Sequence, residues 1–123
     1  MQTVFVVEDA PLVRERLIEM LDATPGTRVV GAAGRADDAI LGILDQQPDV
    51  VLLDLRLAQG NGLDVLRAVH GIAPEITFYM LSSHTAEPYR QLAVKLGAQD
   101  FFDKATDFER VRDIIAARSA TKH

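Results

Sequence analysis

The segment from Asp49 to Asp54 limits the possible folds of this chain more than any other part of its sequence. Its central residues, Val50-Val51-Leu52-Leu53, are consecutive large apolar side chains without polar alternation. Such a run is typical of a strand buried on both faces, as in a parallel sheet covered by helices. The segment ends on a carboxylate, Asp54, and ligands of open α/β sheets bind beyond the carboxyl ends of the strands. We therefore expect Asp54 at the chemically active edge of such a sheet.

Strand-like and helix-like segments alternate along the rest of the chain. Further strands are expected at residues 4–7, 28–33, 76–81 and around 101–102, and each expected strand is followed by apolar residues at helical spacing. The fourth helical stripe includes Tyr89, and Thr106 with Glu109 forms a capping-box pattern before the last one. Five strand–helix alternations predict βαβ units with right-handed crossovers and a single parallel sheet.

Composition limits the class of protein. The 123 residues are 48% hydrophobic and 25% charged, as expected for one globular domain that buries about two-thirds of its unfolded surface. No apolar run approaches the ~18 residues of a membrane span, and the N-terminus lacks a signal-peptide pattern. Disulfides and thiolate metal sites are excluded because there is no cysteine, and the net charge of −5 argues against nonspecific nucleic-acid binding by this domain. We expect a soluble cytoplasmic protein.

Polar residues with compatible chemistry follow four of the expected strands. They are Glu8 and Asp9 after the first strand, Asp54 after the third, Ser82 after the fourth and Lys104 after the fifth. Parallel strands bring these residues to one edge, where two like charges about 5 Å apart repel by roughly 3 kcal/mol at an effective dielectric of 20. Either one acid stays protonated or a cation lies among the carboxylates. Oxygen ligands with room for water favour Mg²⁺, and a hydroxyl and a lysine opposite would suit a phosphate group.

This pattern resembles the receiver domain of bacterial two-component response regulators, and Asp54-Leu55-Arg56-Leu57 resembles the branch joined to helix-turn-helix transcription regulators. The resemblance covers residues 1–118, with 119–123 as a C-terminal tail. It implies a doubly wound, flavodoxin-like sheet of five parallel strands in the order 2-1-3-4-5, with five helices. Arg110, Arg112, Arg118 and Lys122 gather near the C-terminus, which suits the end of a helix.

The resemblance also assigns roles by position. Asp54 would be the phosphoacceptor; Glu8, Asp9, Asp54 and the backbone carbonyl of Arg56 would hold Mg²⁺; Ser82 and Lys104 would bind the phosphoryl group. Phe101 falls at the aromatic switch position, Gly62 matches the glycine after the phosphoacceptor loop, and Arg56 and His84 flank the site and would set the lifetime of the phosphate.

The implied function is a signalling switch and not an enzyme in its own right. Asp54 would take a phosphoryl group from a histidine kinase or phosphotransfer protein, and the surface of helix 4, strand 5 and helix 5 would then change. The output would be a protein target or a DNA-binding domain outside this chain, and a homodimer through that surface is possible on family grounds.

Three departures from the family pattern bear on the site. Ala105 replaces a proline that often follows the lysine with a cis peptide, so a trans bond and a different loop are expected, since a non-proline cis bond costs about 3 kcal/mol. Ala58 replaces a usual loop proline, which predicts a looser loop after Asp54. Phe101 lacks the hydroxyl of the tyrosine often found there, so any switch would work by packing.

Three other functions remain open at this point. A small aspartyl-phosphate phosphatase would need a second acid where this chain has Arg56. A flavodoxin-like mononucleotide carrier would need a Ser/Thr/Gly-rich phosphate loop where Glu8-Asp9 would repel phosphate. A degenerate receiver that acts as a phosphorylation-independent interaction module would need a geometric defect around Ala105.

Overall fold

Strands and helices alternate throughout the computed structural model, which describes residues 1–83 and 87–121. The strands are β1 (Gln2–Val7), β2 (Thr27–Ala33), β3 (Val50–Asp54), β4 (Thr77–Ser82) and β5 (Ala98–Asp103). The helices are α1 (Pro11–Asp22), α2 (Ala36–Gln46), α3 (Gly62–His70), α4 (Glu87–Lys95) and α5 (Phe108–Thr121). The predicted alternation of strand and helix is confirmed.

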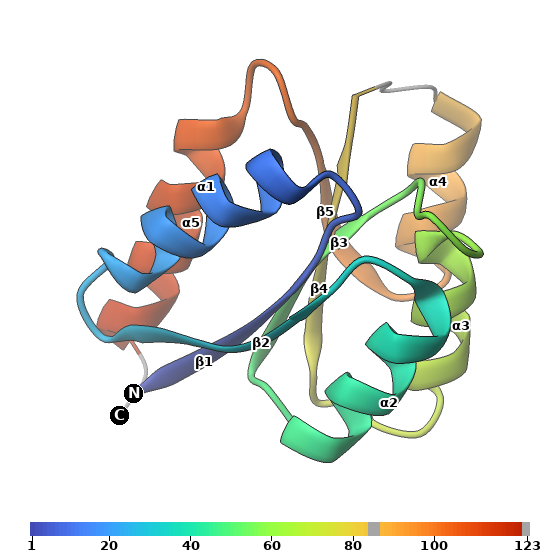
Figure 1. The fold of residues 1–123 in the computed structure, drawn as a ribbon, viewed down its shortest axis with the longest axis horizontal. Coiled ribbons are helices and arrows are strands. Elements are labelled where there is room, and N and C mark those ends of the chain that lie inside the picture. The colour runs from blue at the N-terminus through green and yellow to red at the C-terminus, as the bar shows by residue number, and fades with distance from the viewer. Residues whose placement is uncertain (84–86, 122–123) are drawn as a thin grey trace.

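All five strands form one parallel sheet in the order β2-β1-β3-β4-β5, as expected. Helices α1 and α5 cover one face, and α2, α3 and α4 cover the other (Figure 1). Because every strand runs in the same direction, the residues that end β1, β3, β4 and β5 meet at one edge. In the part of the chain described, no helix is long and apolar enough to cross a membrane.

The central strand β3 explains why its sequence lacks alternation. Val50, Val51, Leu52 and Leu53 are all fully buried. Val51 and Leu53 pack into the core beneath α2, α3 and α4, whereas Val50 and Leu52 pack into the core beneath α1 and α5. A strand covered on both faces has no side left for polar residues. Asp54 therefore lies at the end of a strand whose residues are all buried.

Helix ends follow the local sequence signals in most places. Pro11 is the first residue of α1, where its missing N–H costs nothing, and Pro88 lies in the first turn of α4. The side chain of Asn61 caps α3 by accepting from the backbone N–H of Asp64.

Two expectations about helices are corrected, and the structure adds detail to the predicted C-terminal tail. The prediction of a capping box is wrong. Helix α5 begins at Phe108, so Thr106 lies in the preceding turn and is not the N-cap residue. Tyr89 is 46% exposed and does not belong to the buried stripe of α4, whereas Ala93 of the same predicted stripe is fully buried. Helix α5 continues through Thr121, so residues 119–121 of the expected tail are helical.

At the opposite edge of the sheet, a buried polar network fastens α5 to the strands. Gln2 is 1% exposed, and its side-chain Nε2 donates to the backbone oxygen of Ile115 at 3.0 Å. Arg118 donates from Nε to Gln2 Oε1 at 3.2 Å and from its Nη2 to Thr77 Oγ1 at 3.3 Å. The last helix is therefore joined to β1 and β4 by side-chain bonds as well as by apolar packing.

Candidate functional site

Three carboxylates converge at the carboxyl edge of the two central strands. Glu8 and Asp9 directly follow β1, and Asp54 is the last residue of the neighbouring β3. One side-chain oxygen from each lies within 4.8 Å of the others. Glu8 and Asp54 are buried, whereas Asp9 is exposed to solvent. The predicted acidic cluster therefore exists as a shallow site, closed beneath and open above.

Lys104 places one ammonium group between the two buried acids. Its Nζ lies 2.5 Å from Glu8 Oε1 and donates to Asp54 Oδ2 at 2.9 Å. The Lys104 ammonium is the partner of this buried oxygen, and no other donor of the described residues reaches Glu8 Oε1. Glu8 Oε2 accepts from the backbone N–H of Ala10 at 3.1 Å. Lys104 thus supplies one positive charge to two of the three acids.

The three acids have different pKa values because their surroundings differ. Burial raises the pKa of Asp54 to about 7, a rise that the nearby Glu8 charge reinforces and the Lys104 ammonium opposes. Burial also raises the pKa of Glu8, but the bonds from Lys104 and Ala10 outweigh it and leave that pKa lowered. The pKa of Asp9 is raised by burial and by Glu8. Burial lowers the pKa of Lys104, yet its two carboxylate partners raise it overall. Lys104 and Glu8 thus form the charged pair, and Asp54 is the group that titrates near neutrality.

The remaining predicted residues surround this centre. Ser82 ends β4 and is 2% exposed, and its carbonyl accepts from the backbone N–H of Lys104 at 2.9 Å. The backbone N–H of Arg56 donates to Asp54 Oδ1 at 3.4 Å, while the Arg56 side chain is exposed. Phe101 is fully buried, with the Arg90 guanidinium 5.5 Å from its ring centroid. His84 lies outside the described residues.

The β3–α3 loop is fastened to its neighbours where a loose loop was expected. The backbone N–H of Ala58, which a proline would lack, donates to the carbonyl of Gly34 at 3.2 Å. Gln59 accepts from the first turn of α2, through its carbonyl from Ala36 N–H at 2.9 Å and through Oε1 from Asp37 N–H at 3.1 Å. Gly62 packs so closely on the Asp54 carbonyl that a side chain there would overlap it. The prediction of a looser loop, which was based on Ala58, is therefore wrong.

The loop after Lys104 is held by hydrogen bonds that include the backbone N–H of Ala105. All peptide bonds of the described residues are trans, as expected for Lys104–Ala105. The backbone N–H of Ala105 donates to Asp103 Oδ1 at 2.7 Å, and Asp107 Oδ2 accepts from the N–H of Asp103 at 3.0 Å. The loop thus has an ordered turn without proline, and no defect is visible around Ala105 in this part of the structure.

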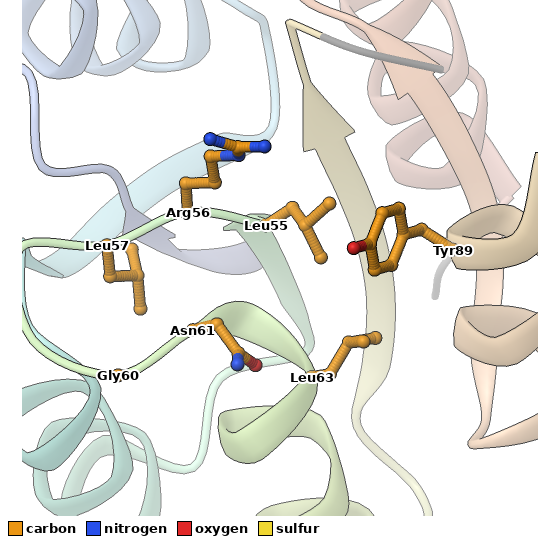
Figure 2. Close-up of a pocket in the computed structure, with 7 residues that line it drawn as sticks. All are labelled: Leu55, Arg56, Leu57, Gly60, Asn61, Leu63 and Tyr89. Atoms are coloured by element: carbon orange, nitrogen blue, oxygen red, sulfur yellow. The ribbon is translucent and has the colours of Figure 1, made fainter. Parts of the chain in front are cut away.

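A pocket of about 380 Å³ adjoins the site on the α4 side. Tyr89 points across it toward Leu55 and Leu63, whereas Arg56 extends from the opposite side of the loop (Figure 2). Sequence reasoning missed this position because Tyr89 fits a buried helical stripe equally well. Leu57, Gly60 and Asn61 complete the lining.

Comparison with known proteins identifies this arrangement. A family model described as the response regulator receiver domain matches residues 4–116. The chain belongs to the response regulator receiver domain family. The resemblance inferred from the sequence is thereby confirmed, together with its place in two-component systems.

Curated relatives of this receiver domain are longer proteins of more than one kind. The chain is 34% identical over 123 residues to the DNA-binding transcriptional activator DevR/DosR of Mycobacterium tuberculosis, covering 97% of this chain and 57% of that protein. It is 38% identical over 103 residues to a protein-glutamate methylesterase/protein-glutamine glutaminase of Symbiobacterium thermophilum, covering 82% of this chain and 28% of that protein. The receiver domain thus spans about half or less of these curated relatives.

Solved structures agree on the fold of the receiver domain. A two-component response regulator of the LuxR family from Aurantimonas sp. SI85-9A1 superposes with a TM-score of 0.88 at 25% identity, over 98% of this chain and 86% of that one. The response regulator domain of Thermotoga maritima CheB superposes with a TM-score of 0.85 at 26% identity, over 98% and 94% of the two chains. The flavodoxin-like architecture is confirmed.

The donor set of this receiver domain fits a Mg²⁺ ion. Carboxylate oxygens are the ligands that Mg²⁺ prefers, and Glu8, Asp9 and Asp54 each offer one within the same small volume. Glu8 Oε1 is buried and already faces one cation, the Lys104 ammonium at 2.5 Å, so this oxygen lies in surroundings that hold a positive charge. Asp9 is open to solvent, which leaves room for the water ligands that Mg²⁺ usually retains.

Proposed function

We propose that this receiver domain accepts a phosphoryl group on Asp54 in a Mg²⁺-dependent reaction and thereby switches an output surface. The observation that carries the proposal is the pair of buried acids, Glu8 and Asp54, facing one lysine ammonium beside the exposed Asp9. A purely structural ion pair would not require a third carboxylate open to solvent. The family membership supports the same function.

The reaction is a transfer between two side chains. An Asp54 oxygen attacks phosphorus in line, the O–P bond forms, and the N–P bond of a phosphohistidine on the partner breaks, with the leaving imidazole nitrogen taking up a proton. The ionised form of Asp54 is the nucleophile, so the cationic surroundings that favour this form also favour transfer. The Lys104 ammonium then pairs with the phosphoryl oxygens, and the Ser82 hydroxyl donates a hydrogen bond to one of them.

Glu8, Asp9, Asp54 and the backbone carbonyl of Arg56 would hold Mg²⁺, which when bound neutralises charge on the transferring group. Lys104 moves from the two acids to the phosphoryl group as part of the same exchange. The protein thus contributes positioning and charge, and the covalent change is confined to Asp54. Arg56 and His84 remain the proposed determinants of phosphate lifetime.

The output is proposed to be a population shift on the face formed by α4, β5 and α5. Phe101 is already buried, and Arg90 from α4 lies over its ring while also facing Asp100 at 3.8 Å. Arg110 from α5 faces the same Asp100 carboxylate at 3.6 Å. A displacement of Ser82 toward the phosphoryl group would change the packing of Phe101. It would also shift α4 and α5, because Asp100 is ion-paired with an arginine of each helix. A histidine kinase or phosphotransfer protein would act upstream, and a protein target or DNA-binding domain downstream.

The test is phosphorylation by a small-molecule donor. The protein is incubated with acetyl phosphate and MgCl₂, and its intact mass is read beside Asp54→Asn and a chelator-treated sample. One phosphoryl gain that requires both Asp54 and Mg²⁺ supports the proposal. Asp64→Asn, which removes an exposed carboxylate from the next helix, is the matched control and should be phosphorylated normally.

The same experiment separates the alternatives. A folded protein that binds Mg²⁺ yet gains no phosphoryl group from acetyl phosphate or a phosphohistidine donor would contradict the proposal and favour a phosphorylation-independent interaction module. Continuous release of phosphate from unrelated phosphomonoesters would favour the phosphatase instead.

A further inference from the structure

Glu8 and Asp9 present a geometric problem, because both side chains reach the same acidic cluster. Adjacent residues of an extended strand point to opposite faces of the sheet. The chain must therefore leave strand geometry between these two residues. It does so at once: β1 ends at Val7, and the backbone N–H of Glu8 makes a last bond to the Ala33 carbonyl of β2 at 2.9 Å.

This departure takes the Glu8 carbonyl out of the sheet ladder. Glu8 is fully buried, and a buried carbonyl needs a hydrogen-bond partner. Arg14 supplies it, donating from Nη1 to the Glu8 oxygen at 2.8 Å. The donor lies one turn into α1, where the Arg14 N–H bonds the Ala10 carbonyl at 2.9 Å. The helix that follows the acid pair thus reaches back to fix the peptide that joins the two acids.

The Arg14 guanidinium is confined on its other side by the β2–α2 loop. A side-chain carbon on Gly34 would lie 3.2 Å from Arg14 Nη1 and 3.3 Å from the Asp9 Cα. The carbonyl of Gly34 in turn accepts from Ala58 in the β3–α3 loop. Contacts therefore run from Arg14 and Gly34 to the loops that carry Glu8, Asp9 and Arg56.

We propose that Arg14 is a positioning residue of the acidic site. By donating to the Glu8 carbonyl it holds the Glu8–Asp9 peptide in the orientation in which both carboxylates face one Mg²⁺ ion. The inference rests on the proposed function and extends it to a residue that touches neither the metal nor the phosphoryl group.

Positioning and charge predict opposite effects, which makes the role of Arg14 measurable. A guanidinium close to the acids repels Mg²⁺, so if charge alone mattered, removing it would tighten Mg²⁺ binding. Loss of the orienting bond instead weakens binding, and outer-shell partners of metal ligands typically contribute 10- to 100-fold in metal affinity. Because Mg²⁺ keeps several waters and depends on few protein ligands, we expect the lower end of that range.

The experiment titrates MgCl₂ into the ¹⁵N-labelled protein and follows its amide resonances, with no phosphodonor present. Arg14→Ala is expected to raise the Mg²⁺ dissociation constant about tenfold. Arg14→Lys keeps the charge but not the planar fork, so it should restore binding only in part. The matched control is Arg16→Ala, which removes an exposed arginine of the same helix whose guanidinium lies over Phe108; its dissociation constant should equal that of the wild type.

Gly34→Ala provides a second route if Arg14→Ala does not fold. The added methyl would press on the Arg14 guanidinium and on the Asp9 Cα while Arg14 is retained, so Mg²⁺ affinity should fall. The part of that loss that acts through Arg14 should vanish in the Arg14→Lys background. An unchanged or lower dissociation constant in folded Arg14→Ala would overturn the inference and leave the proposed function intact. No Mg²⁺ binding by the wild type would overturn both.

Discussion

One ammonium group serves two buried carboxylates in this receiver domain, and that sharing makes Asp54 sensitive to pH. Lys104 faces both Glu8 and Asp54, but Glu8 is also bonded by the Ala10 N–H. The second partner lets Glu8 keep its charge, while burial leaves Asp54 with a pKa of about 7. The nucleophile of the proposed reaction is thus the acid whose charge costs most in the absence of Mg²⁺.

The stability of the metal-free protein should reflect this raised pKa. The folded state holds the Asp54 proton more tightly than the unfolded chain, whose pKa is near 3.8. The contribution of Asp54 to the free energy of unfolding therefore falls as pH rises from about 4 to 7 and is constant above that window. Asp54→Asn cannot titrate, so its stability relative to the wild type should be greater at pH 8 than at pH 5 in urea unfolding. An equal difference at both pH values would contradict the prediction, and Asp64→Asn controls for net charge.

Glycine at position 62 is required by space and not by backbone angle. A side-chain carbon there would overlap the Asp54 carbonyl and lie 3.0 Å from Met80 Cε. Gly62→Ala should destabilise the fold by about 1–3 kcal/mol, the usual range for overpacking. Gly71, which ends α3 with φ −68° and open space around it, is the control. Gly71→Ala should be neutral or stabilising by up to about 1 kcal/mol in the same urea titration.

Among the elements, α2 is capped by a residue from another loop. Its own N-cap residue, Arg35, makes no side-chain cap bond within the described structure. Gln59 supplies that bond instead, so the start of α2 depends on the loop that follows the phosphoacceptor. A movement of that loop would therefore be felt by α2 as well as by the face of α4, β5 and α5.

Removing the Gln59 side chain should weaken this connection measurably. Gln59→Ala loses the bond to Asp37 N–H but keeps the backbone bond to Ala36, so we expect a cost of about 0.5–1 kcal/mol, at the lower end for helix caps. Gln46→Ala, which removes an exposed glutamine bonded to its neighbour Asp45, should stay within about 0.5 kcal/mol. Chemical denaturation compares the two, and an equal loss in both would argue against the cap.

The sequence predicts elements better than it predicts the bonds between loops. The lack of alternation in β3 and the acids at strand ends identify the sheet and the acidic cluster, because both depend on local pattern. Ala58 and Ala105 could be read only as missing prolines, whereas in the structure each uses the N–H that proline lacks. The bonds of Arg14 and Gln59 join residues on different segments and leave no periodic trace, so no signal in the sequence could have indicated them.

At the level of the whole molecule, the two edges of the sheet have different tasks. The carboxyl edge gathers charge for the proposed chemistry, while the amino edge fastens α5 through Gln2, Thr77 and Arg118. Arg118 was predicted only as a basic residue suited to a helix end; its bond to a side chain 116 residues away could not be read from local pattern. Separating the two tasks lets the site change without loosening the last helix.

Arg118→Ala should therefore destabilise the domain without weakening Mg²⁺ binding. Gln2 Oε1 would lose its partner in a buried position, at a cost of about 1–3 kcal/mol. Arg112→Ala, which removes an exposed ion pair with Asp113 on the same helix, should cost at most about 1 kcal/mol. Urea unfolding gives the stabilities and the MgCl₂ titration gives the affinities. A large affinity loss in Arg118→Ala would show that the two edges are not independent.

The bond from Gln2 to Ile115 also has a consequence for biosynthesis. It joins residues 113 apart, so the Gln2 side chain gains this partner only after nearly the whole of this domain has been synthesised. At about 5–20 residues per second, that interval is roughly 6–23 seconds. During it the face of β1 and β3 that α5 later covers is open to chaperones and proteases. A nascent chain that stalls before α5 is made would therefore keep that apolar face uncovered, and any output domain encoded downstream would begin to emerge only after the sequence of α5 had been synthesised.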